Sequence, residues 1–327
     1  MKILVTGGAG YIGSFVTRML QDEGHDVVIL DNLAYGHRAA VTAPVEVVDL
    51  GDRSAVERVF EVHRPDAVMH LAAWIDVNES VNDPAKYFVN NTGYTAMLLE
   101  VMARQEVSVF VFSSTAAVYG TPDAIPISES APTRPESPYG LSKLLTEMSL
   151  PAHSNAYGTR WIALRYFNAA GAALDGTTGE DHEPATHLIT NVIKGALGQK
   201  PFTLFGDDYP DTPDGTCLRD YIHVLDIAAA HVVALEHLSG GGKSGVFNVG
   251  TGRGLTNLEV VNAVKRISGT DLPVTIGPRR AGDPSRLVAD AGLLRRTMGW
   301  EPRYSDLDTI VESSWRWQKS HPQGYGE

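Results

Sequence analysis

The sequence predicts an α/β fold of the Rossmann type, a doubly wound parallel sheet with a smaller C-terminal α/β lobe. In the first half, short apolar segments alternate with longer segments of helical length, and a glycine-rich segment follows the first of them. Beyond residue 168 the alternation loosens. Strands this apolar are buried on both faces, as in parallel sheets covered by helices. A chain of 327 residues is long enough for a main domain and a second lobe.

The expected strands of the main sheet share an apolar, β-branched composition; they are residues 2–7, 26–31, 45–50, 66–73, 107–114 and 161–168. Segments of helical length separate them, at residues 11–23, 53–63, 85–104 and 139–157. Parallel neighbouring strands need a crossover of a dozen or more residues, usually a helix. The order of these segments therefore predicts repeated βαβ units.

The second half is less regular. Residues 169–184 are rich in glycine, small and acidic residues, and are expected to form a loop that leaves the sheet. The later expected strands are residues 201–206 and 245–250, and the later expected helices are residues 224–238, 257–268 and 307–320. We expect one Rossmann domain over residues 1–168, to which some later segments return, and a second lobe formed mainly by residues 169–327.

Composition limits the possible functions. A formal net charge of -12 opposes binding of nucleic acid or an anionic membrane by bulk attraction, so an anionic ligand needs local cations or backbone amides. The single cysteine, Cys217, cannot form an internal disulfide. No apolar segment reaches the ~18 residues of a membrane span, and Met1 begins directly on a strand-like segment without a signal-peptide pattern. We expect a cytoplasmic protein without nucleic-acid or membrane partners.

Gly7, Gly10 and Gly13 lie between the first expected strand and the first expected helix, with Tyr11 and Ile12 among them. Glycines at such a turn let the backbone approach a pyrophosphate, while the amides and the positive end of the helix receive its charge. The spacing is G-x-x-G-x-x-G rather than G-x-G-x-x-G. We interpret the segment as a dinucleotide-binding loop; the alternative is a glycine-rich turn without a ligand.

Asp31 ends the second expected strand, where a carboxylate accepts hydrogen bonds from the ribose hydroxyls of adenosine. Because a carboxylate repels a 2'-phosphate, Asp31 favours NAD over NADP, although Arg38 keeps NADP open as an alternative. Asp49 and Leu50 follow the third strand, where adenine is expected. Further cofactor contacts are expected at the ends of the fourth and fifth strands, at Leu71, Ala72, Ala73 and Ser113.

Tyr139 and Lys143 lie four residues apart in an expected helix, so their side chains share one face. A free phenol has a pKa near ~10, and lowering it by about 3 units requires about 4 kcal/mol. One cation some 4 Å away, at an effective dielectric constant near ~20, supplies roughly that amount. We interpret the pair as a catalytic base and its activating cation; the alternative is a surface pair without a role.

Three hydroxyl residues, Ser113, Ser114 and Thr115, end the fifth expected strand, beside the cleft that Tyr139 would face. A hydroxyl there can bind a sugar hydroxyl and relay its proton to the phenolate. We favour Thr115 for this relay and Ser114 second, and assign Ser113 to the strand end. The alternative is a serine-rich turn whose hydroxyls bind its own backbone.

The chain resembles the extended short-chain dehydrogenase/reductase superfamily and, within it, the UDP-glucose 4-epimerases (UDP-galactose 4-epimerases). The resemblance runs nearly end to end, through "VTGGAGYIGS", "SSTAAVYG", "SPYGLSK", "LRYFNAAGA", "LFGDDYPDTPDGTCLRDYIHVLD", "NVGTG", "RRAGDP" and "HPQGY". It implies an isomerase of carbohydrate metabolism, acting on galactose and glucose units, that uses NAD to oxidise C4 of a UDP-hexose. Hydride then returns to the opposite face of a 4-keto intermediate.

The resemblance also implies roles for individual residues. NAD contacts would be Gly7, Gly10, Ile12, Asp31, Asn32, Asp49, Leu50, Asn90, Tyr139, Lys143 and Phe167. UDP-sugar contacts would be Thr115, Tyr139, Asn168, His187, Leu188, Arg219, Arg280, Asp283 and Leu287. Residues 1–168 would then be the NAD-binding domain and residues 169–327 mainly the nucleotide-sugar-binding lobe. No metal is implied, and relatives pair as homodimers through helices corresponding to residues 85–104 and 139–157.

Two positions depart from relatives. Ile75 stands where some relatives have a cofactor-contacting lysine, and Leu287 is smaller than a tyrosine beside the C2 substituent of the sugar, so N-acetylated sugars or UDP-pentoses remain alternatives. Ala116 and Ala117 follow Thr115 where dehydratases commonly have an acid pair, which disfavours elimination. A decarboxylase, a net reductase and a non-catalytic NAD sensor are further alternatives. His223 is expected to be structural.

Overall fold

The computed structural model describes residues 1–280 and 284–326. These residues form two compact units. Unit 1 comprises Met1–Gly120, Thr133–Arg165 and Ala228–Phe247, and unit 2 comprises Thr121–Pro132, Tyr166–Ile227 and Asn248–Glu327. The chain therefore passes repeatedly from one unit to the other. Among the described residues, no helix has the length and apolar character needed to cross a membrane.

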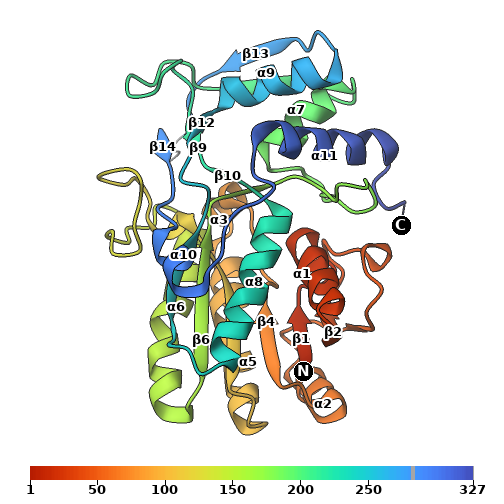
Figure 1. Cartoon of the computed structure of the whole chain (residues 1–327), viewed down its shortest axis with the longest axis vertical. Coiled ribbons are helices and arrows are strands. Elements are labelled where there is room, and N and C mark those ends of the chain that lie inside the picture. The colour runs from red at the N-terminus through yellow and green to blue at the C-terminus, as the bar shows by residue number, and fades with distance from the viewer. Residues whose placement is uncertain (281–283, 327) are drawn as a thin grey trace. The chain divides into compact units, whose positions relative to one another are not determined.

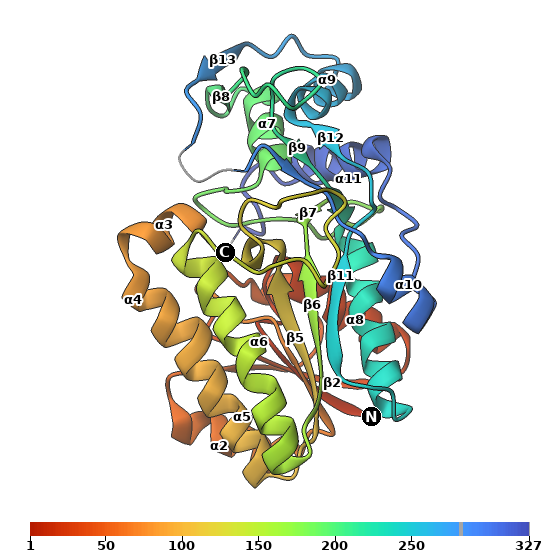
Figure 2. The same cartoon turned by 90° about the vertical axis from the view of Figure 1, so that its left-hand side faces the viewer.

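A seven-stranded sheet is central to unit 1, with the strand order β11-β6-β5-β4-β1-β2-β3 (Figures 1 and 2). Its strands are β1 (Lys2–Thr6), β2 (Asp26–Asp31), β3 (Val45–Val47), β4 (Ala67–His70), β5 (Val109–Thr115), β6 (Arg160–Tyr166) and β11 (Gly245–Val249). β1 is parallel to both neighbours, with Val5 opposite Ile29 and Met69. The strand order reverses at β1, and such a switch point is where open sheets bind ligands. The predicted fold class is confirmed, and β11, a late strand, lies in the main sheet.

Helices cover both faces of this sheet. α2 (Arg53–His63), α5 (Thr95–Arg104) and α6 (Pro138–Tyr157) lie on one face, and α1 (Tyr11–Asp22) and α8 (Val224–Ser239) lie on the other (Figure 2). The apolar side chains of β1, β5 and β6 pack under the first group; the core there includes Leu4, Phe60, Leu98, Phe110 and Trp161. These strands read as continuous apolar runs because both of their faces are covered.

The expected helix over residues 85–104 consists of three consecutive segments: α4 (Pro84–Tyr87), a π-helix (Phe88–Tyr94) and α5. A pattern with a period of 3.6 residues does not reveal such a change, and π-helical turns often occur at functional sites. Here the side chain of Asn91 donates to the carbonyl of Trp74 (3.0 Å) and to the Ser142 hydroxyl (3.2 Å). Through the side chain of Asn91, the π-helix is therefore hydrogen-bonded both to the segment after β4 and to α6.

Several short elements were not expected from the sequence. They include α3 (Val77–Asn82), α7 (Leu188–Ala196), α10 (Gly292–Met298) and the 3₁₀ turns Arg38–Ala40 and Ala116–Val118. The expected strand over residues 161–168 ends at Tyr166, and a separate strand, β7 (Asn168–Ala170), follows it. Elements of one or two turns carry too few residues for a hydrophobic period to emerge.

In unit 2, α7 (Leu188–Ala196), α9 (Asn257–Ser268) and α11 (Leu307–Ser320) contact one another (Figure 1). Their shared core includes Ile189, Val192, Val260 and Ile310. The remaining strands form three small sheets: β7 with β10 (Tyr221–His223), β8 (Phe202–Phe205) with β13 (Val274–Gly277), and β9 (Leu218–Arg219) between β12 (Leu255–Thr256) and β14 (Arg286–Leu287). These short strands place loop residues close together around α7 and β9.

Candidate active site

The glycine loop lies between β1 and α1, as the sequence predicts. Gly7 has a φ of 70°, and a Cβ there would lie 2.5 Å from the backbone nitrogen of Ala72. A Cβ at Gly13 would lie 2.0 Å from the carbonyl oxygen of Gly7. No side chain caps α1, which begins after Gly10 with Tyr11 and Ile12. The helix therefore presents uncapped backbone amides beside a loop that only glycine can form, which fits a pyrophosphate.

The adenosine end of the predicted cofactor site is also organised. Asp31 is buried at the end of β2, and its carboxylate accepts hydrogen bonds from the backbone nitrogens of Ala9 (3.0 Å) and Leu33 (2.9 Å). Burial raises the pKa of Asp31, while these two bonds oppose the rise. Asn32 donates to Asp49 (2.8 Å), which brings the ends of β2 and β3 together. Leu50 is buried beside them.

The ends of β4 and of the π-helix complete one side of this region. Leu71 and Ala72 follow β4, and their backbone nitrogens donate to the carbonyl oxygen of Thr6 at 3.0 and 3.1 Å, which keeps Leu71, Ala72 and Ala73 beside the end of β1. Asn90 lies in the π-helix and donates to Asn91 (2.9 Å). Asn91 and Trp74 were missed by sequence reasoning, because their role depends on the wide helical turn.

Thr115 and Tyr139 act on each other. Thr115 ends β5, and its hydroxyl oxygen accepts a hydrogen bond from the backbone nitrogen of Ala117 (3.1 Å). Burial raises the pKa of Tyr139, and the nearby hydroxyl of Thr115 opposes this rise. A phenol whose pKa is raised in this way is protonated at neutral pH. The lowered pKa expected from Lys143 alone is not found here.

Lys143 lies one turn after Tyr139 on α6 and is fully buried. Its Nζ donates to the carbonyl oxygen of Ser113 (2.9 Å) and lies 4.9 Å from the centre of the Phe112 ring. Burial lowers the pKa of Lys143 to about 7, and the charge of Glu147 works in the opposite direction. Near neutral pH, the ammonium is close to losing its proton.

Ser114, the second predicted relay hydroxyl, lies on the other side of this cluster. It is buried, and its hydroxyl donates to the carboxylate of Glu147. Glu147 also pairs with Arg165 through bonds of 2.5 to 3.2 Å. The proton of Ser114 is thus directed to Glu147, whereas the proton of Thr115 is available to Tyr139. Glu147 and Arg165 were not among the residues predicted from the sequence.

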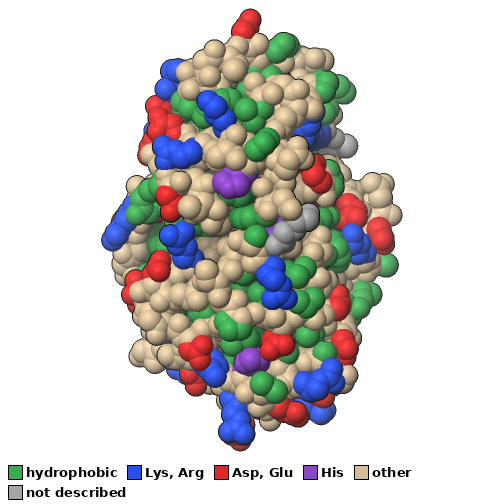
Figure 3. Space-filling view, turned by 90° about the vertical axis from the view of Figure 1, so that its right-hand side faces the viewer, with side chains coloured by type: hydrophobic (Ala, Val, Ile, Leu, Met, Phe, Trp, Pro, Cys, Tyr) green, Lys and Arg blue, Asp and Glu red, His purple; other side chains and the backbone are tan. Residues whose placement is uncertain are grey.

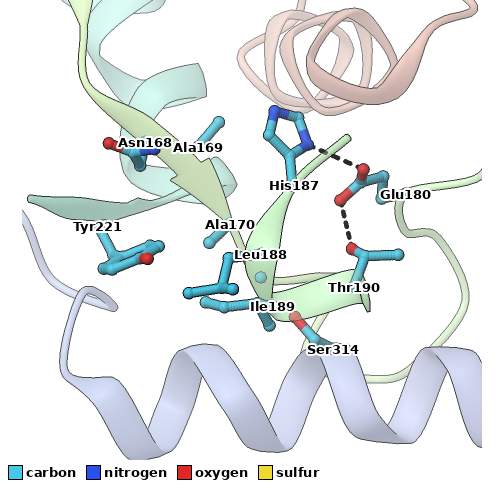
Figure 4. A pocket seen from close by; sticks show the side chains of 11 residues that line it. Asn168, Ala169, Ala170, Glu180, His187, Leu188, Ile189, Thr190, Tyr221 and Ser314 are labelled. Carbon is cyan, nitrogen blue, oxygen red and sulfur yellow. Dashed lines mark hydrogen bonds and ion pairs between the residues drawn. The ribbon is translucent and has the colours of Figure 1, made fainter. Parts of the chain in front are cut away.

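In unit 2, a pocket opens beside the start of α7. Figure 4 shows the predicted contacts Asn168, His187 and Leu188 among the residues that line it, together with Glu180 and Tyr221. Asn168 lies on β7, directly opposite Tyr221 on β10. His187 immediately precedes α7, so its ring lies next to the positive end of that helix. Three of the predicted substrate residues therefore meet in one place.

Glu180 organises this pocket and was missed by sequence reasoning. Its carboxylate accepts hydrogen bonds from His187 Nδ1 (2.8 Å) and from the Thr190 hydroxyl (2.5 Å), as the dashed lines in Figure 4 mark. His182 Nε2 lies 3.0 Å from the same carboxylate. The histidines hold the pKa of Glu180 below its usual range, and Glu180 raises the pKa of His187. Glu180, His182 and His187 bring three potential metal-ligand atoms within 4.8 Å of one another.

The remaining predicted substrate residues lie around β9 and β8. Arg219 is buried on β9, opposite Leu287 of β14, and donates to the carbonyl oxygens of Leu218 (3.0 Å) and Ser285 (3.3 Å). Arg280 lies 4.2 Å from the ring centre of Phe205 on β8. Phe167, predicted to touch NAD, is buried between β6 and β7 in unit 2. Asp283 lies outside the described residues.

The surface offers no strongly basic patch on the face shown in Figure 3, where acidic and basic side chains are interspersed.

His223, expected to be structural, is fully buried between Ser313 (3.2 Å to Nε2) and the backbone nitrogen of Leu225 (3.1 Å to Nδ1). Burial lowers its pKa to about 4, so it is neutral near pH 7. Individual groups that offer positive charge for an anionic ligand are Arg219, Arg280 and His187.

Comparison with known proteins agrees with this geometry. The model of the NAD dependent epimerase/dehydratase family matches residues 3–250. The chain is 47% identical to the UDP-glucose 4-epimerase of Lacticaseibacillus casei over 100% of this chain and 99% of that protein. The crystal structure of UDP-glucose 4-epimerase from Brucella ovis in complex with NAD is 45% identical, with a TM-score of 0.93 over 96% of this chain and 97% of that one.

The crystal structure of the enzyme from Bifidobacterium longum in complex with NAD+ and UDP is 39% identical, with a TM-score of 0.93 over 99% of this chain and 100% of that one. Family model, sequence relatives and solved structures all span most of the chain. The resemblance noted in the sequence is thereby confirmed. The chain belongs to the NAD dependent epimerase/dehydratase family and, within it, to the UDP-glucose 4-epimerases.

Proposed function

We propose that this chain interconverts UDP-glucose and UDP-galactose by oxidising C4 of the hexose with bound NAD and reducing it again from the opposite face. The observation that carries this proposal is that Tyr139, whose pKa the hydroxyl of Thr115 lowers, lies one helical turn from the buried Lys143. This supports an acid-base group and a cation acting together beside the carboxyl end of β5. Relatives at 47% identity that bear the epimerase name support the same activity.

The residues of unit 1 fit NAD. A Cβ at Gly7 or Gly13 would collide with the backbone of Ala72 or of Gly7, so the glycines permit the tight turn and close packing of a dinucleotide-binding loop. The buried Asp31 carboxylate suits the ribose hydroxyls of a cofactor without a 2'-phosphate. When bound, NAD supplies the acceptor and donor of hydride. We assign its binding to the glycine loop, Asp31, Asn32, Asp49 and Lys143.

In the proposed reaction, Tyr139 takes the proton of the C4 hydroxyl while the C4 hydrogen leaves as hydride, so the substrate loses two electrons and becomes a 4-ketone. The hydroxyl of Thr115 favours the phenolate, and we propose that the charge of Lys143, one helical turn away, adds to this effect in the NAD-loaded protein. Tyr139 returns its proton when hydride re-enters C4 on the opposite face. The net reaction changes configuration and leaves the redox state unchanged.

We assign the nucleotide part of the substrate to unit 2. Arg219, Arg280 and His187 offer positive charge for a diphosphate on a chain of net charge -12, and charge-assisted hydrogen bonds are the strong ones. Asn168 and Leu188 line the same pocket as His187. The Bifidobacterium longum relative, whose structure contains UDP, supports a uridine nucleotide. We propose UDP-hexoses as the substrate class.

The experiment for this proposal is incubation of the purified protein with UDP-galactose and no added cofactor, followed by separation of the products. UDP-glucose should appear, because the protein is expected to carry NAD through purification. A 4-keto-6-deoxy sugar would indicate a dehydratase, and binding of NAD without turnover would indicate a sensor. Ala116 and Ala117 after Thr115 offer no acid for elimination, which favours the first outcome.

The range of sugars rests on Leu287. We propose that leucine leaves room for a bulky C2 substituent, so that UDP-N-acetylgalactosamine is also converted. Leu287 lies directly opposite Arg219 and is partly buried. Leu287→Tyr should remove conversion of the N-acetylated sugar and retain that of UDP-galactose, with Leu287→Met as the control of similar volume. Equal loss of both activities would contradict a selective role for this position.

We further propose a homodimer that works in the cytoplasm. Exposed apolar side chains gather on α3, the π-helix and α6: Val77, Val81, Val89, Leu141, Leu145 and Met148. Figure 2 shows α6 beside α3, α4 and α5, so these helices can supply one continuous apolar surface of unit 1. A single buried cysteine fits a reducing compartment. Sedimentation of the protein and of Met148→Glu tests the pairing, since the charge should dissociate it.

A further inference from the structure

A buried ion pair lies behind the proposed catalytic residues, and the reaction scheme above does not use it. Glu147 and Arg165 have side-chain exposures of 4% and 6%, and both oxygens of the carboxylate bind the guanidinium. Replacing a buried ion pair by apolar residues is often neutral or stabilising, so stability alone does not explain its presence. The position of Glu147 on α6, the helix that carries Tyr139 and Lys143, points to a role in the chemistry.

Glu147 lies on the same helical face as the proposed base and its cation. Tyr139, Lys143 and Glu147 are spaced at intervals of four residues along α6, so consecutive members are neighbours. Lys143 is buried, and its Nζ bonds only to a neutral carbonyl oxygen, that of Ser113, within the described part of the chain. A buried ammonium without a carboxylate partner loses its proton readily. Glu147 is the carboxylate whose charge opposes that loss.

Other titratable groups face Lys143 from the neighbouring elements. His70 on β4 is fully buried between Thr6 and Thr95 (2.7 Å each), and its pKa is lowered to about 3, so it stays neutral. Tyr119, after β5, accepts a hydrogen bond from Arg165 (2.9 Å). Arg165 on β6 carries the opposing positive charge. Tyr139 is the proposed base, whose phenolate the charge of Lys143 would stabilise. Among these neighbours, Glu147 contributes the negative charge.

We propose that Glu147 is a positioning residue that keeps Lys143 protonated, with Arg165 and Ser114 holding its carboxylate in place, and that it thereby sets the alkaline limit of the reaction. The hydroxyl of Ser114 and the guanidinium of Arg165 bind both carboxylate oxygens, so the carboxylate is held in one orientation. The effect on the reaction rests on the proposed epimerase function. The coupling between Glu147 and Lys143 does not.

Glu147→Gln tests this role, because glutamine can still accept bonds from Ser114 and Arg165 but lacks the charge. The ε-carbon of Lys143 is followed by NMR in ¹³C-lysine-labelled, NAD-loaded protein; the signal absent from Lys143→Met identifies it. We expect the midpoint of its titration to fall by roughly one pH unit. The alkaline limb of the kcat profile for UDP-galactose should move to lower pH by the same amount.

Arg165→Met should move both midpoints in the opposite direction, since it leaves the negative charge of Glu147 less compensated. Tyr119→Phe is the matched control; it removes one bond to Arg165 and should move neither midpoint. An unchanged lysine titration in folded Glu147→Gln overturns the proposal, as does a lysine shift without a shift in kcat. If no UDP-sugar reacts, the proposed function fails, while the lysine titration still decides the coupling. If Arg165→Met does not fold, Glu147→Gln alone carries the test.

Discussion

The buried carboxylate of Glu180 pairs with the partly exposed His187 in the lining of the unit 2 pocket, with 2.8 Å between the carboxylate and Nδ1. The backbone oxygen of Glu180 also accepts hydrogen bonds from Trp317 (3.1 Å) and Gln318 (3.0 Å) of α11. The carboxylate is thereby fixed between α7 and α11. This arrangement lets His187 keep a positive charge at a pH where an isolated histidine would be neutral.

The first prediction concerns the pH dependence of substrate binding. Because the pKa of His187 is raised, its charge is present below that pKa and lost as the pH rises through it. The KM for UDP-galactose should therefore increase on the alkaline side. In Glu180→Gln this increase should begin at lower pH, with a KM about 3- to 10-fold higher near pH 7.5 and kcat little changed. A KM independent of pH in the native protein would show that His187 does not bind the diphosphate by charge.

The second prediction concerns the proposed base. Tyr139→Phe removes the hydroxyl that would take the C4 proton and should lower kcat by about 10²- to 10⁴-fold. The NAD content of the purified protein should stay unchanged. Tyr157→Phe is the control, because Tyr157 ends the same helix and is 59% exposed. Full activity in Tyr139→Phe would refute the assignment of the base.

The third prediction is that replacing the buried Lys143 stabilises the fold although it abolishes turnover. Unfolded Lys143 has a pKa of 10.5, and burial lowers this to about 7 in the folded chain. Between these values the unfolded state binds more protons, so the contribution of Lys143 to stability is most unfavourable below pH 7 and improves as the pH rises toward 10.5. Lys143→Met should raise the free energy of unfolding at pH 6 to 7 by about 2–4 kcal/mol.

This gain should shrink as the pH rises toward 10, and the variant should lose turnover. The comparison uses denaturant unfolding of cofactor-free protein at several pH values. Lys243→Met serves as the control, because Lys243 is exposed and its replacement should change stability little. A Lys143→Met protein less stable than the native chain at pH 6 would mean that burial of the Lys143 ammonium does not destabilise the cofactor-free fold.

The fourth prediction compares two glycines with positive φ, of which only Gly7 lies in the glycine loop and has backbone atoms close to it. Gly7 and Gly24 both have positive φ, 70° and 80°. A Cβ at Gly7 would lie 2.5 Å from Ala72, whereas a Cβ at Gly24 meets nothing within 4 Å. Gly24→Ala should therefore cost about 1 kcal/mol of stability and keep its NAD. Gly7→Ala should lose bound NAD as well, measured by release of the cofactor from purified protein. Equal NAD content in both variants would show that the close packing of Gly7 against Ala72 is not needed for cofactor binding.

Much of the fold was predictable because strong, regular patterns determine it. The apolar strands, the glycine loop and the helix that carries Tyr139 and Lys143 each follow from a few neighbouring residues. The end of β2 at Asp31 was expected on the same grounds. That β11 pairs with β6 was not specified by the sequence, which indicated only that some later segments return to the sheet. The π-helix was not, because Asn91 fixes it through contacts with Trp74 and Ser142 that are distant in sequence.

The supporting residues of the site were the part that sequence reasoning missed. Glu147 and Glu180 lie outside the motifs that drew attention to Tyr139 and His187. Their roles arise from burial and from partners such as Arg165 and Thr190, which only the fold brings near. Glu147 lies within a helix, where a carboxylate ordinarily indicates a solvated face, so the sequence did not point to a buried role for it. The pKa of Tyr139 likewise depends on burial, which the spacing of residues does not report.

The decisive measurement follows the hydrogen at C4. UDP-galactose carrying deuterium at C4 is converted by the purified protein in ordinary water, and the UDP-glucose formed is analysed by NMR and mass spectrometry. Return of the same hydride within one active site predicts that the deuterium stays on C4 of the product. Loss of the deuterium to solvent would contradict hydride transfer to and from bound NAD, and with it the proposed role of Tyr139 as the base for that oxidation.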